Sequence, residues 1–141
     1  MPHDPRTFER CRLNWSERDA HQPLVRLHRD LLAMRRSDAA FRAQDATAID
    51  GAVLGAELLV LRYFAPRVED ERLLMVNLGI DVDAGSFAEP LVAPPDGHQW
   101  NVRWSSEHPD YGGRGTPEVE SDSGWRIPGH AALVLRVEKR D

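Results

Sequence analysis

The sequence predicts a mainly β fold: an antiparallel β-sandwich preceded by one amphipathic α-helix. Apolar residues recur at helical spacing in a segment before residue 46 and alternate with polar residues at a period of two after it. Clusters of Gly, Pro, Asn and Asp separate the alternating segments. Six or seven short strands punctuated in this way are typical of a sandwich. We therefore divide the chain into an N-terminal loop and helix, residues 1–45, and a C-terminal β-sandwich domain, residues 46–141.

The N-terminal part is expected to be a polar loop over residues 2–19, followed by a helix from about Pro23 to Arg36. Proline suits the first turn of a helix and arginine the last one. We expect Phe8 and Trp15 to pin the loop to this helix. The apolar stripe of the helix contains Leu24, Val25, Leu27, Leu31, Leu32 and Met34.

This stripe is wider than one face of a sandwich easily covers, so part of it is expected to need a partner. For the isolated chain the simplest partner is a second copy, in a two-fold homodimer formed through the N-terminal helix. The interface candidates are Leu24, Leu27, Leu31 and Met34.

The strands of the sandwich are predicted from alternation and from the turn signals between them. They are expected at residues 48–54, 58–64, 72–78, 89–92, 99–105, 125–127 and 131–138, with a long surface loop over 106–124. The predicted core residues are Leu61, Tyr63, Leu74, Val76, Leu133 and Leu135, each at period two within an apolar strand.

Composition narrows the classes of function. The 41% hydrophobic content suffices for a core, and the net charge of -5 argues against a nucleic-acid surface. The single cysteine, Cys11, cannot form an intramolecular disulfide, and the six histidines lack the spacing of a metal site. No signal peptide or membrane-spanning run is visible, so we expect a cytoplasmic location, no membrane partner and no cofactor.

Several segments, taken together and in order, resemble the C-terminal region of a known enzyme family. The first is the stretch from Asp4 to Trp15, with the pattern Asp-Pro-x-Thr-Phe-Glu-Arg-x-x-Leu-x-Trp. The others are the helix over 27–36 and the segments 60–63, 74–79, 104–107, 111–113 and 128–135. The chain resembles the last barrel helix and the C-terminal β-domain of α-amylase-family glycoside hydrolases, and within that family the malto-oligosyltrehalose trehalohydrolases.

This resemblance implies a role without catalysis for the isolated chain. In the family, carboxylates at the C-terminal ends of the barrel strands cleave the glycosidic bond. All of those motifs lie upstream of the region that matches here, so no residue of this chain inherits a catalytic role. The implied function is that of an accessory domain which covers and stabilises the barrel of an enzyme acting on α-1,4-glucan. The tail of a glycogen branching enzyme shares this plan and is an alternative.

Four aromatic residues in the last third are the candidates for contact with carbohydrate: Trp100, Trp104, Tyr111 and Trp125. Aromatic faces can stack on sugar rings, but the same residues serve equally well as core or loop anchors. In a regular strand Trp100 and Trp104 would face the same side. A free-standing glycan-binding module that takes an α-glucan, or a protein-docking domain that takes a separately encoded barrel, is therefore a further alternative.

The tripeptide His108-Pro109-Asp110 is similar to a pair found in amylase active sites, but it follows no barrel strand. We interpret it as a turn in which Asp110 offers an Asx-type hydrogen bond.

Overall fold

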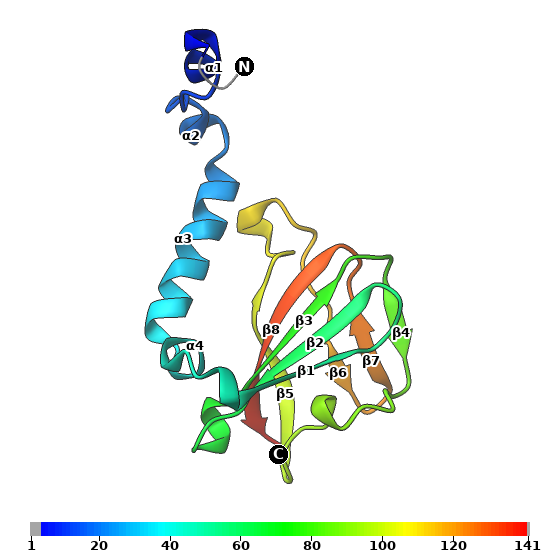
Figure 1. Ribbon diagram of the computed structural model, residues 1–141. Helices are drawn as coiled ribbons and strands as arrows, with labels where there is room; N and C mark the ends of the chain where they lie inside the picture. The colour runs from blue at the N-terminus through cyan, green and yellow to red at the C-terminus, as the bar shows by residue number, and fades with distance from the viewer. Residues whose placement is uncertain (1–3, 141) are drawn as a thin grey trace.

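The computed structural model describes residues 4–140, so that His3, one of the six histidines considered above, lies outside the described residues. A five-stranded antiparallel sheet has the order β1-β2-β3-β8-β5, and a three-stranded antiparallel sheet has the order β4-β7-β6. Figure 1 shows the helices on one side of the large sheet and the small sheet on the other. The structure confirms the predicted mainly β fold, in which the helical segment precedes the strands along the chain.

The chain before the sheets is more helical than expected. The predicted helix is present as α3 (Gln22–Ser37), and α4 (Ala39–Ala43) follows it. The predicted loop over 2–19, however, contains α1 (Pro5–Arg10) and α2 (Glu17–Ala20). The first of these helices begins where the side chain of Asp4 accepts a hydrogen bond from the backbone N–H of Arg6.

The large sheet consists of β1 (Ile49–Val53), β2 (Leu58–Tyr63), β3 (Arg72–Asn77), β8 (Ala131–Lys139) and β5 (His98–Ser105). The small sheet consists of β4 (Val82–Ala84), β7 (Gly124–Ile127) and β6 (Glu120–Ser121). Single 3-10 turns lie between them: η1 (Ala46–Ala48), η2 (Val68–Asp70), η3 (Pro90–Val92) and η4 (Pro109–Tyr111).

One predicted strand is wrong, and two were missed. Residues 89–92 form the turn η3, where Pro90 has no N–H to give to a sheet and the side chain of Glu89 accepts from the N–H of Leu91. The short strands β4 and β6 carry too few residues for alternation to be visible.

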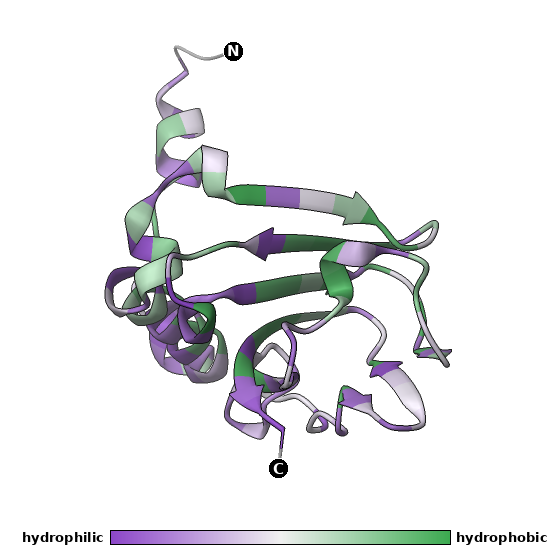
Figure 2. Cartoon of the chain, turned by 90° about the horizontal axis from the view of Figure 1, so that it is seen from below, coloured by the Kyte–Doolittle hydropathy of each residue, from purple (hydrophilic) through white to green (hydrophobic). Residues whose placement is uncertain are grey.

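The core between the two sheets uses one face of the large sheet. Leu133 and Leu135 are fully buried there, as predicted, opposite Met75 and Leu73. Side chains of the small sheet, among them Ile127, close this core from the other side. Green, hydrophobic runs mark the middle strands of the large sheet in Figure 2.

The other four predicted core residues lie on the opposite face of the large sheet and are only half-buried: Leu61, Tyr63, Leu74 and Val76. Their neighbours Val60, Leu73 and Met75 are the buried ones. Strands β2 and β3 are apolar at successive positions because both faces of the sheet are covered, and alternation cannot then tell the inner face from the outer one.

Candidate docking surface and aromatic cluster

The N-terminal half of α3 is held to the β-domain by polar side chains. Arg26 pairs with Asp110 of η4, with 2.9 Å between Nη1 and Oδ2. The hydroxyl of Tyr111 donates to Oδ2 of Asp30 at 2.6 Å and accepts from Nε1 of Trp104 at 3.2 Å. A chain of hydrogen bonds therefore runs from α3 through η4 to strand β5.

The C-terminal end of α3 is held by a buried ion pair. Arg72 of β3 donates from Nε to Oδ2 of Asp38 at 2.8 Å, and both side chains are almost completely buried. Asp38 also caps α4 by accepting from the backbone N–H of Ala40. Next to it, the rings of Phe41 and Tyr63 meet edge to face, with centroids 4.9 Å apart. Both ends of α3 are thus fixed against the outer face of the large sheet.

The apolar stripe of α3 is only partly covered by these contacts. Met34 is buried, and Leu27 and Leu31 are half-buried, whereas Leu24 is 55% and Leu32 49% exposed. The four interface candidates therefore differ in their exposure: Met34 already packs within this chain, whereas Leu24 is open to a partner. Leu32, which was not among them, belongs to the open part of the stripe.

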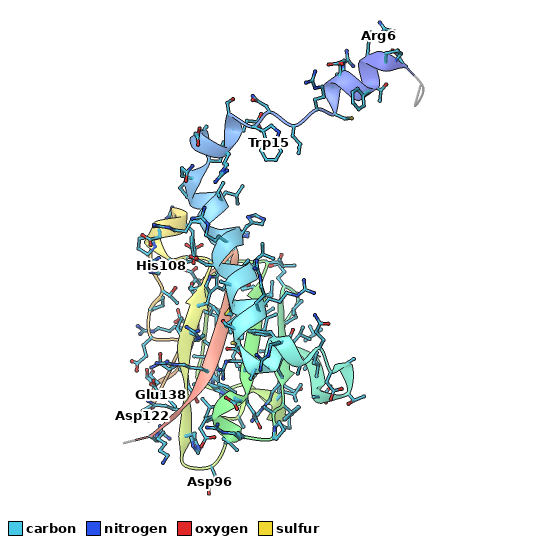
Figure 3. The ribbon with its side chains drawn as sticks, turned by 90° about the vertical axis from the view of Figure 1, so that its left-hand side faces the viewer. Arg6, Trp15, Asp96, His108, Asp122 and Glu138 are labelled. Carbon is cyan, nitrogen blue, oxygen red and sulfur yellow. The ribbon has the colours of Figure 1, made fainter. Side chains whose placement is uncertain are left out.

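The exposed apolar surface continues beyond α3. Phe8, Leu13 and Trp15 are each about three-quarters exposed. The expectation that Phe8 and Trp15 pin the chain to the helix is wrong, since α1 and α2 point away from the β-domain and carry Trp15 with them (Figure 3). We call α1, α2 and the exposed side of α3 the helical arm.

Two of the four aromatic candidates are core residues. Trp100 is 3% exposed; its Nε1 donates to the carbonyl of Val92 at 2.9 Å, and the guanidinium of Arg62 lies over its ring. Trp125 is 7% exposed and meets Phe87 edge to face at 5.9 Å. Their ring faces are not open for stacking on a sugar.

The other two candidates come together at the base of the helical arm. Trp104 and Tyr111 are half-buried, with ring centroids 6.0 Å apart, and His108 lies against Tyr111. Burial, supported by the hydrogen bond to Asp30, raises the pKa of Tyr111, so its hydroxyl stays protonated and donates to that carboxylate. This cluster orients α3, and carbohydrate contact by the four aromatics stays untested.

Trp104 does not face the same side as Trp100, contrary to the expectation for a regular strand. On β8 the partners of Val102 and Trp104 are successive residues, so β5 contains one extra residue, Arg103. A bulge of this kind reverses the facing of the residues after it. Trp104 therefore points to the outer face, toward α3, while Trp100 stays in the core.

The His108-Pro109-Asp110 segment is a turn, as interpreted, and forms η4. The hydrogen bond within it runs differently from the expectation: Nδ1 of His108 accepts from the backbone N–H of Asp110 at 3.2 Å. Within residues 4–140, no three His, Cys, Asp or Glu side chains gather as a metal site would require. In the same part of the chain, no helix has the length and hydropathy needed to cross a membrane.

Comparison with known proteins gives two findings. The profile of the family described as "Domain of unknown function (DUF3459)" matches residues 46–134, more than half of the chain. Two relatives named malto-oligosyltrehalose trehalohydrolase, from Mycobacterium tuberculosis strains CDC 1551 / Oshkosh and ATCC 25618 / H37Rv, are 50% identical over 40 residues. These residues make up 27% of this chain and 7% of each relative, so the match spans a small part of those proteins. The resemblance found in the sequence is confirmed.

Proposed function

Because the chain belongs to the DUF3459 family, we propose that it is the non-catalytic C-terminal accessory domain of an α-amylase-family enzyme of the malto-oligosyltrehalose trehalohydrolase type. The carrying observation is the 50% identity over 40 residues to two proteins of that name, beside the family match. The substrate of the whole enzyme would be an α-1,4-glucan that ends in trehalose, and its product trehalose. We also propose that the chain divides into an N-terminal part, residues 1–45, and a C-terminal β-domain, residues 46–141.

The role of the domain would be to dock on the catalytic barrel through the helical arm. Ion pairs and hydrogen bonds fix α3 to the β-domain at both ends, so its exposed side is held in a set orientation. Leu24, Leu32 and Trp15 lie open on the arm. A continuous exposed apolar surface is typical of a protein interface. Docking would bury this surface and stabilise both partners.

Catalysis by this chain alone is not part of the proposal. The carboxylates nearest the aromatic cluster already serve the fold, since Asp30 accepts from Tyr111 and Asp110 pairs with Arg26. Purified chain incubated with malto-oligosyltrehalose should release no trehalose above a buffer blank. Turnover that survives repurification would overturn this part of the proposal.

The docking role can be tested with the catalytic barrel of a trehalohydrolase, produced without its C-terminal region. We expect the 141-residue chain to bind the barrel by calorimetry and to raise its melting temperature. Leu24→Glu combined with Leu32→Glu should abolish binding, because burying unpaired carboxylates is unfavourable. Val53→Glu is the control, since Val53 is even more open, at 77% exposed, but lies on β1, away from the arm. Equal binding by both variants would place the interface elsewhere.

A branching-enzyme tail remains the alternative within the same family, and selective binding to a branching-enzyme barrel would favour it. For the chain without a barrel we propose self-association through the same open side of α3. A cytoplasmic location completes the proposal, and cell fractionation tests it.

A further inference from the structure

A cleft of about 1150 Å³ opens between the small sheet and the loop that follows η4. Its walls are the segments 80–85 and 123–130 on one side and Gly115 and Pro117 on the other, with Glu107 and Arg114 at the rim. The small sheet lies across the large sheet from α3, so the cleft is separate from the exposed side of the helical arm (Figure 1).

The wall of the cleft is fixed by hydrogen bonds between its loops. Asn77, 1% exposed, donates from Nδ2 to the carbonyls of Ile80 at 2.7 Å and Pro128 at 3.0 Å. Asp81 accepts from the backbone N–H of Gly129 at 2.7 Å. A Cβ on Gly129 would lie 2.7 Å from the carbonyl oxygen of Gly79, so the two loops are in direct backbone contact. A ligand would therefore meet a preformed surface, which lowers the entropy cost of binding.

The polar side chains of the cleft retain unused hydrogen-bonding capacity. Among the described residues, the side chains of Arg114 and His130 have no hydrogen-bond or ion-pair partner within reach. Arg126 has one contact, a 3.6 Å pair with Asp83, and both side chains are largely exposed. Glu107 accepts only a long bond, 3.4 Å, from the backbone N–H of Arg114. Both donors and acceptors among the lining residues are therefore available to a ligand.

The charges in the cleft favour a neutral ligand. The lining includes three carboxylates, those of Asp81, Asp83 and Glu107, and two guanidinium groups, those of Arg114 and Arg126. This near balance gives neither a phosphate nor a cation a strong field. A polyhydroxyl ligand suits it, because each hydroxyl both donates to a carboxylate and accepts from a guanidinium.

Size and apolar surface point in the same direction. Pockets of about 300–1,000 Å³ bury most of a drug-sized molecule, so this cleft has room for several sugar rings. Ile80, 81% exposed, and the rings of Pro117 and Pro128 lie on its walls and can cover the apolar C–H faces of sugars. We propose that this cleft binds a linear α-1,4-glucan; the choice of α-1,4 linkage rests on the proposed function.

The test is a calorimetric titration of the 141-residue chain with maltoheptaose, combined with chemical-shift mapping by NMR. We expect saturable binding, with shifts at Ile80, Arg126 and His130. Arg114→Ala and Arg126→Ala should each weaken binding about 2- to 10-fold, as for one hydrogen bond lost to a neutral group. Arg103→Ala is the matched control, because Arg103 is an exposed arginine outside the cleft. Cellohexaose, with β-1,4 linkages, should bind at least 10-fold more weakly.

Three results would overturn the proposal: no saturable binding, binding unchanged in both cleft variants, or shifts confined to the helical arm. Equal affinity for cellohexaose would keep the cleft as a glycan site and overturn the α-1,4 assignment. Since no barrel is present in this experiment, its failure leaves the docking proposal standing, and a failure to dock on a barrel leaves the cleft proposal standing.

Discussion

Two adjacent leucines on β3 offer a matched test of which face of the large sheet forms the core. Leu73 is fully buried between the sheets, opposite Leu135. Leu74 is half-buried on the outer face. Replacing each by alanine removes the same carbon atoms from the same strand, so strand propensity and the unfolded chain change almost equally. The difference in stability then reports burial alone.

The magnitudes follow from the two environments. Each buried methylene contributes about 0.8 kcal/mol, and a residual cavity adds to the loss, so Leu73→Ala should cost about 2–5 kcal/mol. Leu74→Ala removes atoms that still touch water and leaves an open surface instead of a cavity, so it should cost about 1 kcal/mol. Urea unfolding followed by tryptophan fluorescence measures both, with an unchanged m-value as the control for two-state behaviour. A cost for Leu74→Ala equal to or above that for Leu73→Ala would refute the assignment of faces.

Three further predictions concern the attachment and the open side of α3. Arg72→Ala should cost about 3–5 kcal/mol in urea unfolding, because it leaves the buried carboxylate of Asp38 without its cation; a loss below 1 kcal/mol would mean that this pair does not hold the helix. The pKa of Tyr111 is raised in the folded chain, so its stabilising effect is complete below the ordinary value of 10.0 and decreases as the pH rises above it; Tyr111→Phe should remove this alkaline decrease in unfolding experiments, and an unaltered pH profile would contradict the assignment. Light scattering of the isolated chain should give a mass above 15.9 kDa, and Leu24→Glu with Leu32→Glu should return it to the monomer value; a wild-type monomer at high concentration would argue against self-association.

Much of the fold was predictable because its signals are local. The stripe of α3 and the alternation or apolar runs of β1, β2, β3, β5, β7 and β8 stand in the sequence itself. The face of the sheet toward which each side chain of β2 and β3 points was not predictable, because a sheet covered on both sides carries apolar residues at every position. Leu58 to Leu61 is such a run, and only the position of its neighbours decides that Val60 lies inside and Leu61 outside.

The aromatic candidates show the same limit. Trp104 and Tyr111 were singled out for another role. The residue of α3 to which Tyr111 donates, Asp30, lies 81 positions away, and no local pattern connects the two. The bulge could not be predicted from the sequence, because its extra residue, Arg103, is an ordinary exposed polar residue. The cleft was missed entirely, since its polar residues come from separate strands and loops that only the sheet topology brings together.

The extra residue in β5 lets a single strand supply large side chains to both faces of the large sheet. Trp100 and Val102 face the interior, whereas Trp104, which follows the bulge, faces the helix. Exchange of Arg103 for another surface residue would preserve this arrangement. Its deletion would preserve it too, because Trp104 would then follow Val102 directly and alternation would still place it on the outer face. At this position the protein should tolerate both substitution and loss of the residue in evolution.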